Sequence, residues 1–246
     1  MQKQANILGV RVDSMTMDQA VMTVESMISG KSSYAHMQLV ATANAEMVMM
    51  ANEDKELATI LAAAQLVVPD GAGVVWAAGK LGHPVPERVA GFDLAQRLFA
   101  LSAEKGYRIY FLGGAPGVAV KAQAAARKRY GSIEFVGVHD GFFKAEEVPT
   151  LVASINESKA DLLFVALGVP KQEKWLYELR NQLTVKVGIG VGGTFDVMAG
   201  VMKRAPLWMQ KTNLEWLFRL MMQPQRALRM LALPRFVIKV LLSKKD

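Results

Sequence analysis

Apolar residues recur with two different periods along the first 200 positions of the chain. Short runs of mostly β-branched residues, typical of buried strands, alternate with longer stretches in which apolar positions repeat at helical spacing. The pattern predicts strands at residues 7–12, 37–41, 66–68, 108–112, 134–138, 162–166 and 186–189. It predicts helices at residues 17–27, 45–50, 55–63, 73–81, 93–105, 118–130, 146–158 and 171–179.

Regular alternation of strands and helices favours an α/β fold. We therefore expect residues 1–200 to form a Rossmann-like, largely parallel sheet with helices on both faces. Residues 201–246 are expected to form a basic helical appendage, with the boundary between Gly200 and Pro206. Pro224 and Pro234 should divide this appendage into short helices, because proline cannot continue a helix interior.

Positive charge is concentrated in the appendage. Residues 203–246 contain ten Lys or Arg and only two acidic residues, Glu215 and Asp246, whereas residues 1–202 carry a net charge of −1. The basic residues are interleaved with tryptophan, leucine, methionine and valine, a composition typical of segments that lie on an anionic membrane surface. The appendage is therefore expected to bind such a surface.

Composition excludes several other classes. The chain has no cysteine, which rules out disulfides and thiolate chemistry and suits a reducing cytoplasm. It shows no secretory signal and no apolar run of the roughly 18–20 residues that span a bilayer. The net charge of +7 could indicate nucleic-acid binding, but the body is nearly neutral, so no nucleic-acid partner is expected. A non-enzymatic, peripheral membrane-binding module stays open as an alternative.

Candidate chemistry lies in the turns that follow the predicted strands, because parallel sheets bind ligands beyond the carboxyl ends of their strands. Asp70 follows an apolar strand between Pro69 and Gly71, where partial desolvation could raise its pKa towards that of a general base. An Asp before Gly is more often a turn or helix cap. Thr42 and Asn44 could orient a sugar hydroxyl, or simply cap the following helix.

The glycine-rich turns offer a second kind of candidate. Gly113 and Gly114, with Gly117, could cradle a phosphate before a helix, or could only form a tight turn. The glycines at positions 188, 190, 192 and 193 miss the dinucleotide-binding spacing, and no Walker A motif is present.

No metal or other cofactor is expected. The three histidines are scattered, and the chain lacks the Asp-x-Asp element that holds a divalent ion on a diphosphate. A bound diphosphate would then need cationic side chains, and the candidates are Arg88, Lys171, Lys203, Arg204, Arg219, Arg226 and Arg229.

Taken together and in this order, eight segments resemble the WecG/TagA/CpsF family of bacterial glycosyltransferases. They are residues 42–46 (TANAE), 68–71 (VPDG), 87–93 (ERVAGFD), 137–143 (GVHDGFF), 167–173 (LGVPKQE), 190–196 (GVGGTFD), 203–206 (KRAP) and 215–226 (EWLFRLMMQPQR). The resemblance covers nearly the full length. Residues 233–242 (LPRFVIKVLL) are most similar to the TagA branch, whose members are N-acetylmannosaminyltransferases of wall teichoic acid assembly.

The resemblance implies that Asp70 is the catalytic base and that no metal is needed. It implies that Thr42, Asn44, Arg88 and Gln172 line the sugar pocket, completed by Arg219 and Arg229 from the appendage. Our predicted substrate site also includes the residues of the other turns, Gly113, Gly114, Gly193, Thr194 and Asp196.

The implied reaction is an inverting transfer of N-acetylmannosamine from a UDP-sugar donor to undecaprenyl-diphosphate-linked N-acetylglucosamine. It would take place at the inner face of the cell membrane, on a peripheral cytoplasmic enzyme. Two points stay open. The donor could be another UDP-sugar, such as the uronic acid form or a hexose, used for enterobacterial antigen, capsule or exopolysaccharide. The chain could also form a homo-oligomer.

Overall fold

The computed structural model describes residues 3–30, 36–212, 214–223 and 227–243, without the side chains of Lys211, Arg219, Ala227 and Leu228. We call residues 1–200 the body and residues 201–246 the tail. Pro224, Arg226, Lys244, Lys245 and Asp246 lie outside the described residues, so expectations for them stay predictions.

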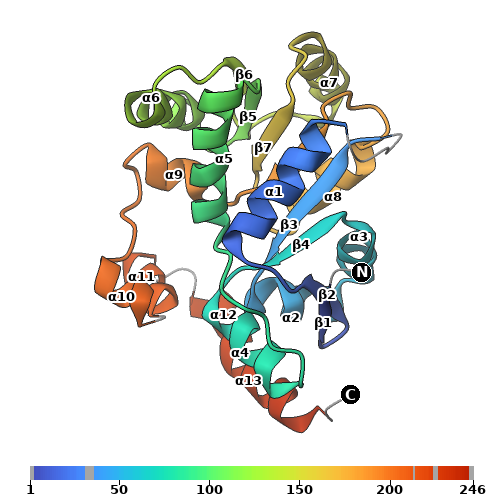
Figure 1. Cartoon of the computed structure of the whole chain (residues 1–246), viewed down its shortest axis with the longest axis vertical. Coiled ribbons are helices and arrows are strands. Elements are labelled where there is room, and N and C mark those ends of the chain that lie inside the picture. The colour runs from blue at the N-terminus through green and yellow to red at the C-terminus, as the bar shows by residue number, and fades with distance from the viewer. Residues whose placement is uncertain (1–2, 31–35, 213, 224–226, 244–246) are drawn as a thin grey trace.

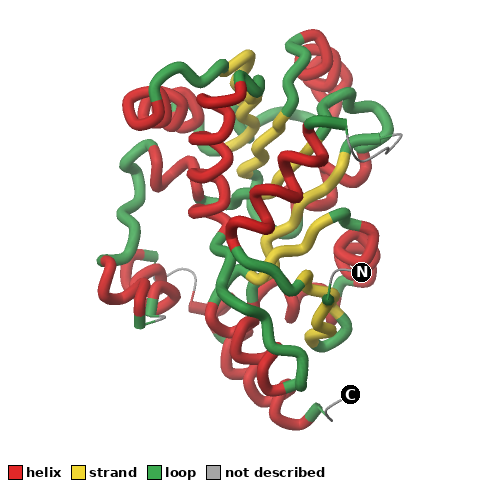
Figure 2. The backbone as a smooth tube through the Cα atoms, viewed as in Figure 1, coloured by secondary structure: helices red, strands yellow, loops and turns green. Residues whose placement is uncertain are grey.

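A six-stranded parallel sheet forms the centre of the body (Figures 1 and 2). Its strands are β3 (Gln38–Ala43), β4 (Leu66–Pro69), β5 (Ile109–Gly113), β6 (Phe135–His139), β7 (Leu162–Ala166) and β8 (Val187–Gly190). They follow the order β4-β3-β8-β7-β5-β6, and every pairing is parallel. The inner strands are mostly apolar because both sheet faces are covered. The predicted α/β fold class is confirmed.

Helices cover both faces of this sheet. One face packs against α1 (Met17–Ile28), α5 (Gly91–Lys105) and α6 (Val118–Tyr130), and α1 and α5 lie in front of the sheet in Figure 1. The other face packs against α2 (Ala45–Glu53), α3 (Lys55–Ala63), α7 (Val148–Glu157) and α8 (Lys171–Leu179). Alternation along β3 divides the two cores: Leu39 and Ala41 belong to the second, and Val40 to the first.

The prediction of one strand over residues 7–12 is wrong. The segment forms an antiparallel hairpin of β1 (Gln4–Ile7) and β2 (Val10–Asp13), separate from the main sheet. Leu8 and Gly9 form its two-residue turn with φ values of 52° and 88°, the left-handed conformation that tight hairpin turns require. Asp13 attaches the hairpin to the edge of the sheet, because its Oδ2 accepts the N–H of Val67 at 2.8 Å.

The predicted helices are confirmed with small differences at their ends. The bounds of α3, α6 and α8 agree with the prediction, whereas α4 (Ala72–Lys80) and α5 each begin one or two residues earlier. A short 3-10 helix, η1 (Ala145–Glu147), precedes α7. The structure adds α9 (Thr194–Met198), which follows Gly193 and was not predicted.

The tail contains α10 (Leu207–Lys211), α11 (Glu215–Met222), α12 (Ala227–Met230) and α13 (Ala232–Leu242). In Figure 1, α10 and α11 lie beside the body, and α12 and α13 lie against α4. Phe236 and Val240 bury one face of α13 against the body. The division at residue 200 stays a prediction, although the tail packs on the body at several places.

Pro234 does not separate two helices as predicted. It lies in the first turn of α13, and the break falls three residues earlier, at Leu231. The first turn tolerates proline, because the N–H that proline lacks would have no partner within the helix there. None of the helices within the described ranges is long and apolar enough to cross a membrane.

Candidate active site

Four turns that follow neighbouring strands meet at one edge of the sheet. Strands β4, β3, β8 and β7 are adjacent and parallel, so their carboxyl ends point the same way. The turns after them carry Asp70, Asn44, Gly193 and Gln172, in that order. The predicted site residues from these turns are therefore brought together, at the place where parallel sheets bind ligands.

Asp70 stands at the end of β4 and is half-buried. Its N–H donates to the carbonyl of Ala43 at 2.8 Å, which ties the turn to β3. Gly71 follows with φ at 104°, a conformation that favours glycine, and a Cβ there would lie 3.6 Å from the Cβ of Asn44. The sharp turn into α4 thus places Asp70 beside Asn44.

Two pockets adjoin Asp70 and Asn44. The inner pocket, of about 90 Å³, lies within the body and is lined by Thr42, Asn44, Asp70, Gly91, Phe92, Val169, Gln172, Val191, Gly192, Gly193, Thr194 and Val197, with Met202 from the tail. The outer pocket, of about 140 Å³, lies between body and tail and is lined by residues 44–46, residues 70–73, Arg88, Glu215, Trp216, Arg229, Met230 and Leu233. Asp70 and Asn44 line both, so one carboxylate can reach groups bound on either side.

Packing around the inner pocket leaves little freedom to its small polar residues. The hydroxyl of Thr42 lies 3.5 Å from the carbonyl of Gly190, and a Cβ on Gly91 would lie 3.0 Å from the Thr42 methyl group. Thr194 donates its hydroxyl to the carbonyl of Val191 at 2.7 Å, in the turn before α9. Asn44 caps α2, because its Oδ1 accepts the N–H of Met47 at 2.9 Å. Asn44 therefore has the helix-capping role that the sequence suggested as an alternative, and this role occupies its Oδ1 but not its Nδ2.

Gln172 is almost fully buried at the start of α8 and lines the inner pocket. Its Oε1 accepts the N–H of Gly192 at 3.0 Å, and its Nε2 donates to Oε1 of Glu173 at 2.8 Å. Burial raises the pKa of Glu173 from its ordinary value of 4.5 to about 7, although the Gln172 hydrogen bond lowers it. Two buried polar side chains thus form one chain of hydrogen bonds behind the pocket.

The outer pocket holds two arginines, and each is paired with a carboxylate. Arg88, from the body, lies 3.4 Å from Glu215 of α11. Arg229, from α12 of the tail, pairs with Glu46 of α2. The two ion pairs run in opposite senses between body and tail, and both lie in the pocket wall beside Asp70.

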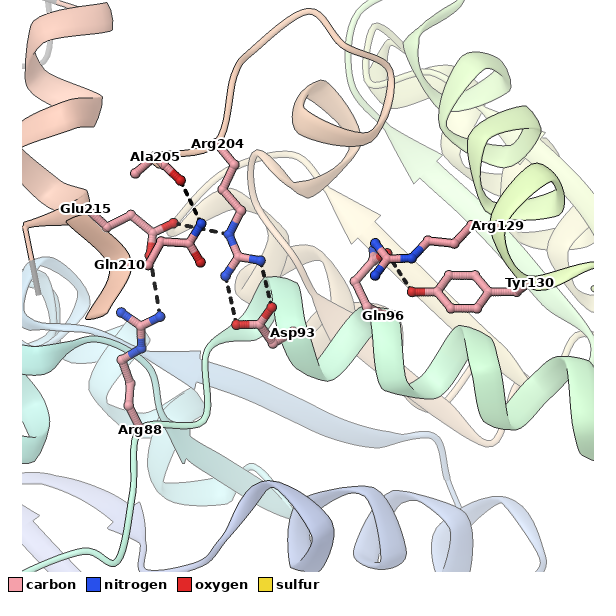
Figure 3. A network of polar contacts seen from close by, with 9 residues as sticks. All are labelled: Arg88, Asp93, Gln96, Arg129, Tyr130, Arg204, Ala205, Gln210 and Glu215. Atoms are coloured by element: carbon pink, nitrogen blue, oxygen red, sulfur yellow. Dashed lines mark hydrogen bonds and ion pairs between the residues drawn. The ribbon is translucent and has the colours of Figure 1, made fainter. Parts of the chain in front are cut away.

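A larger network joins the tail to the body through Arg204 (Figure 3). Its guanidinium donates two hydrogen bonds of 2.7 Å to the carboxylate of Asp93 in the first turn of α5. The same guanidinium stacks 4.4 Å from the ring centre of Phe92 and lies 3.6 Å from Glu215. Because Glu215 also contacts Arg88, one network of ion pairs connects α5, the start of the tail, α11 and the outer pocket.

Arg204 lines neither pocket, unlike Arg88 and Arg229, so the structure does not favour it as a diphosphate ligand. Figure 3 also shows Gln210 of α10, whose Nε2 donates to the carbonyl of Ala205 at 2.6 Å. Gln96, Arg129 and Tyr130 form a separate contact between α5 and α6, and none of them lines either pocket.

Some predicted residues lie away from the two pockets. Gly113 allows β5 to approach β7, since a Cβ there would lie 2.4 Å from the carbonyl oxygen of Ala166. Gly114 donates its N–H to that same oxygen and adjoins an open hollow with Lys171 and Phe142, so this N–H is not available to an anion. Asp196 lies in α9 outside both pocket linings. The side chain of Arg219 lies outside the described part of α11.

Sequence reasoning missed several residues that the structure brings to the site: Glu46, Asp93, Glu173, Glu215 and Trp216. A signal existed for Glu215, since it is the one acidic residue within the basic appendage before the terminal Asp246. Glu46 lies two positions after Asn44 and pairs with Arg229, 183 residues away, which the sequence alone does not reveal. Glu173 follows its hydrogen-bond partner Gln172, but the burial of the two side chains depends on how α8 packs on the sheet.

No group of three or more His, Cys, Asp or Glu within the described residues could hold a metal ion. The site polarity instead comes from carboxylates, amides and arginines. A reaction without metal remains a prediction.

Comparison with known proteins identifies the class of this enzyme as a glycosyltransferase. Residues 5–246 match the Glycosyl transferase WecG/TagA/CpsF family, and the chain belongs to this family. The resemblance drawn from the sequence motifs is therefore confirmed.

Two similar relatives carry the name N-acetylglucosaminyldiphosphoundecaprenol N-acetyl-beta-D-mannosaminyltransferase. The protein from Bacillus subtilis (strain 168) is 35% identical over 209 residues, which cover 85% of this chain and 80% of that relative. The protein from Staphylococcus aureus (strain MRSA252) is 34% identical over 242 residues, which cover 98% of this chain and 94% of the relative.

Proposed function

We propose that this enzyme transfers N-acetylmannosamine from UDP-N-acetylmannosamine to the 4-hydroxyl of N-acetylglucosamine on undecaprenyl diphosphate. The transfer would invert the anomeric centre and build the linkage unit of wall teichoic acid. The names of the relatives support the acceptor and the transferred sugar. Family membership argues against a purely non-enzymatic membrane module.

One observation carries the proposed mechanism: Asp70 lines both pockets. A general base for glycosyl transfer must reach the acceptor hydroxyl while that hydroxyl faces the anomeric carbon of the donor. A carboxylate between two pockets meets this requirement, because each substrate can occupy one of them. Asp70 would accept the proton as the acceptor oxygen attacks the anomeric carbon and the bond to UDP breaks.

The side from which the lipid-linked acceptor approaches suggests which substrate each pocket would bind. The outer pocket is closed by tail helices whose free surfaces are apolar, so a lipid-linked acceptor would enter from that side. The donor sugar would then occupy the inner pocket, among Thr42, Asn44 and Gln172. Arg88 and Arg229 lie in the outer pocket, where phosphate oxygens of the lipid-linked acceptor could replace Glu215 and Glu46 as partners.

The exposed surface of the tail supports peripheral binding to an anionic membrane. Ile238, Leu241 and Leu242 each expose more than half of their surface on α13, which also carries the exposed basic residues Arg235 and Lys239, and Trp208 of α10 is exposed to a similar extent. Large apolar side chains next to cations fit the boundary between lipid headgroups and acyl chains. The membrane surface would then present the acceptor to the outer pocket.

The decisive experiment incubates the full chain with UDP-N-acetylmannosamine and a short-chain lipid-diphosphate-N-acetylglucosamine, with and without EDTA. We expect a disaccharide product with inverted stereochemistry and unchanged rate under chelation. Parallel reactions with UDP-N-acetylmannosaminuronic acid and a UDP-hexose test the alternative donors. Turnover of one of these donors but not of UDP-N-acetylmannosamine would overturn the assigned sugar, and a strict requirement for a divalent ion would overturn the metal-free mechanism.

A further inference from the structure

Gln172 and Glu173 stand side by side at the start of α8, and both are almost completely buried. Gln172 faces the inner pocket, whereas Glu173 lies behind it and does not line either pocket. A buried carboxyl is costly unless something in its surroundings repays the loss of hydration. Glu173 Oε2 is buried and has no hydrogen-bond partner among the described residues, so packing alone would favour an apolar residue here.

The orientation of the Gln172 amide follows from its two partners. The backbone N–H of Gly192 can only donate, so the group that faces it must be Oε1. Nε2 must therefore point to Glu173, whose Oε1 accepts one of its two protons. A carboxyl oxygen can accept this bond whether Glu173 is ionised or neutral. The contact therefore fixes the amide in both protonation states.

The surroundings leave no room for another arrangement. A Cβ on Gly190 of β8 would lie 2.5 Å from Nε2 of Gln172 and 2.8 Å from Oε1 of Glu173. Only a residue without a side chain at position 190 lets the two polar groups pack against the strand. The second proton of Nε2 has no acceptor among the described residues, and Gln172 is one of the residues that line the inner pocket.

We propose that Glu173 is a positioning residue that holds the Gln172 amide so that its second N–H donates to an oxygen of the ligand in the inner pocket. The inference rests on the proposed function, since the ligand there would be the sugar nucleotide. Without Glu173 the amide could turn and present its carbonyl to the pocket, where it would repel hydroxyl, carbonyl or phosphate oxygens that need a donor.

A double-mutant cycle tests this proposal. The variants are Glu173→Met, Gln172→Ala and the double variant, and the measurement is the Kd for UDP-N-acetylmannosamine without acceptor, with KM and kcat alongside. We expect Glu173→Met to raise Kd and KM about tenfold, the size of one ligand hydrogen bond, with a smaller change in kcat. In the Gln172→Ala background the same substitution should change Kd less than twofold, because the amide it positions is gone.

Two controls separate positioning from general damage to the helix. Glu173→Gln keeps an accepting oxygen next to Gln172 and should keep Kd within twofold of the wild type. Trp175→Phe removes another buried polar atom of the same helix, Nε1, which has no hydrogen-bond partner among the described residues. This variant should leave Kd unchanged even where it lowers the melting temperature.

An equal loss of affinity in both backgrounds, or wild-type affinity in Glu173→Met, would overturn the positioning role while leaving the proposed function intact. Failure of the wild-type enzyme to bind UDP-N-acetylmannosamine would overturn both.

Discussion

Body and tail treat their large apolar side chains in opposite ways. Fourteen large apolar side chains are exposed in the described part of the protein, and eleven of them lie after residue 200. Within the described tail, only Ala205, Met209, Phe236 and Val240 are buried apolar residues. Exposed apolar surface on this scale usually marks a site of contact with another molecule or a membrane. Within the described residues, the body buries most of its large apolar side chains, whereas the tail leaves most of its own exposed.

The charges show the complementary difference. The body is nearly neutral, and the tail is strongly basic. Two tail arginines form ion pairs with body carboxylates, Arg204 with Asp93 and Arg229 with Glu46. Ion pairs thus contribute to the contact between tail and body, while the free surface of the tail is rich in apolar groups. This distribution suits a segment that is attached to the enzyme on one side and faces lipid on the other.

The largest expected effect comes from removing the proposed base in the body. Asp70→Asn should lower kcat by about 10²–10⁴, because the amide keeps the size of the side chain but cannot accept a proton. Binding of UDP should stay within a few-fold, which calorimetry can measure. Asp140→Asn, in a turn at the far edge of the sheet, is the matched control and should keep full activity. Retention of more than about a tenth of the wild-type rate by Asp70→Asn would contradict the assignment of the base.

The second effect concerns the packing of the body and depends on pH. The pKa of Glu173 is raised to about 7 by burial, so the folded protein binds this proton more tightly than the unfolded chain. The stabilising contribution is present below the ordinary pKa and is lost as the pH rises through 7. Relative to the wild type, Glu173→Gln should therefore gain about 3 kcal/mol in unfolding free energy between pH 4.5 and pH 8.

Urea unfolding of both proteins at several pH values measures this difference. A gap between Glu173→Gln and the wild type that stays constant from pH 4.5 to pH 8 would show that the carboxyl does not titrate in this range.

The third effect lies at the junction between body and tail. Arg204→Ala removes a bidentate, partly buried ion pair with Asp93 and should lower the unfolding free energy by about 2 kcal/mol. Arg97→Ala is the matched control, since the pair of Arg97 with Asp18 is exposed and should contribute less than about 1 kcal/mol. Equal losses for the two variants in urea unfolding would mean that the network does not stabilise the junction.

The smallest effect tests the tail surface alone. Ile238→Glu combined with Leu241→Glu should weaken sedimentation with anionic vesicles about tenfold, because two apolar groups lose a favourable contact and gain like-charge repulsion. Met22→Glu combined with Val120→Glu changes equally exposed residues of the body and should have no effect. If the two double variants weakened vesicle binding equally, the exposed apolar residues of the tail would have no special role in membrane binding.

Much of the fold could be predicted because local signals and the global arrangement agree. Helix α3 begins after Asp54, whose Oδ1 accepts the N–H groups of Glu56 and Leu57, and α6 lies between Gly117 and Gly131. The exceptions are places where local signals mislead. The hairpin turn places Leu8, rather than Gly, Asn or Asp, in the left-handed region. The glycines before Thr194 are typical of a loop, so the short helix α9 that follows them was not predicted.

Only those site residues that lie in the turns at one edge of the sheet could be predicted from the sequence. Parallel strands bring their carboxyl ends together, so Thr42, Asn44, Asp70 and Gln172 could be grouped from strand order and turn position. The pairing of Arg88 with Glu215 could not, because it joins residues 127 positions apart through the packing of α11 on the body. The chain of hydrogen bonds from Glu173 to Gly192 likewise depends on how α8 lies on β8.

The paired arginines of the outer pocket have a consequence for the arrival of a charged ligand. Arg88 and Arg229 are each neutralised by a carboxylate, so these four side chains add no net charge to the pocket. An incoming phosphate would exchange partners with a carboxylate rather than enter an uncompensated positive field. Long-range steering through solvent would be weak, and the association rate would depend little on ionic strength. If the tail binds a membrane as proposed, diffusion of the ligand along that membrane would then govern how often it reaches the pocket.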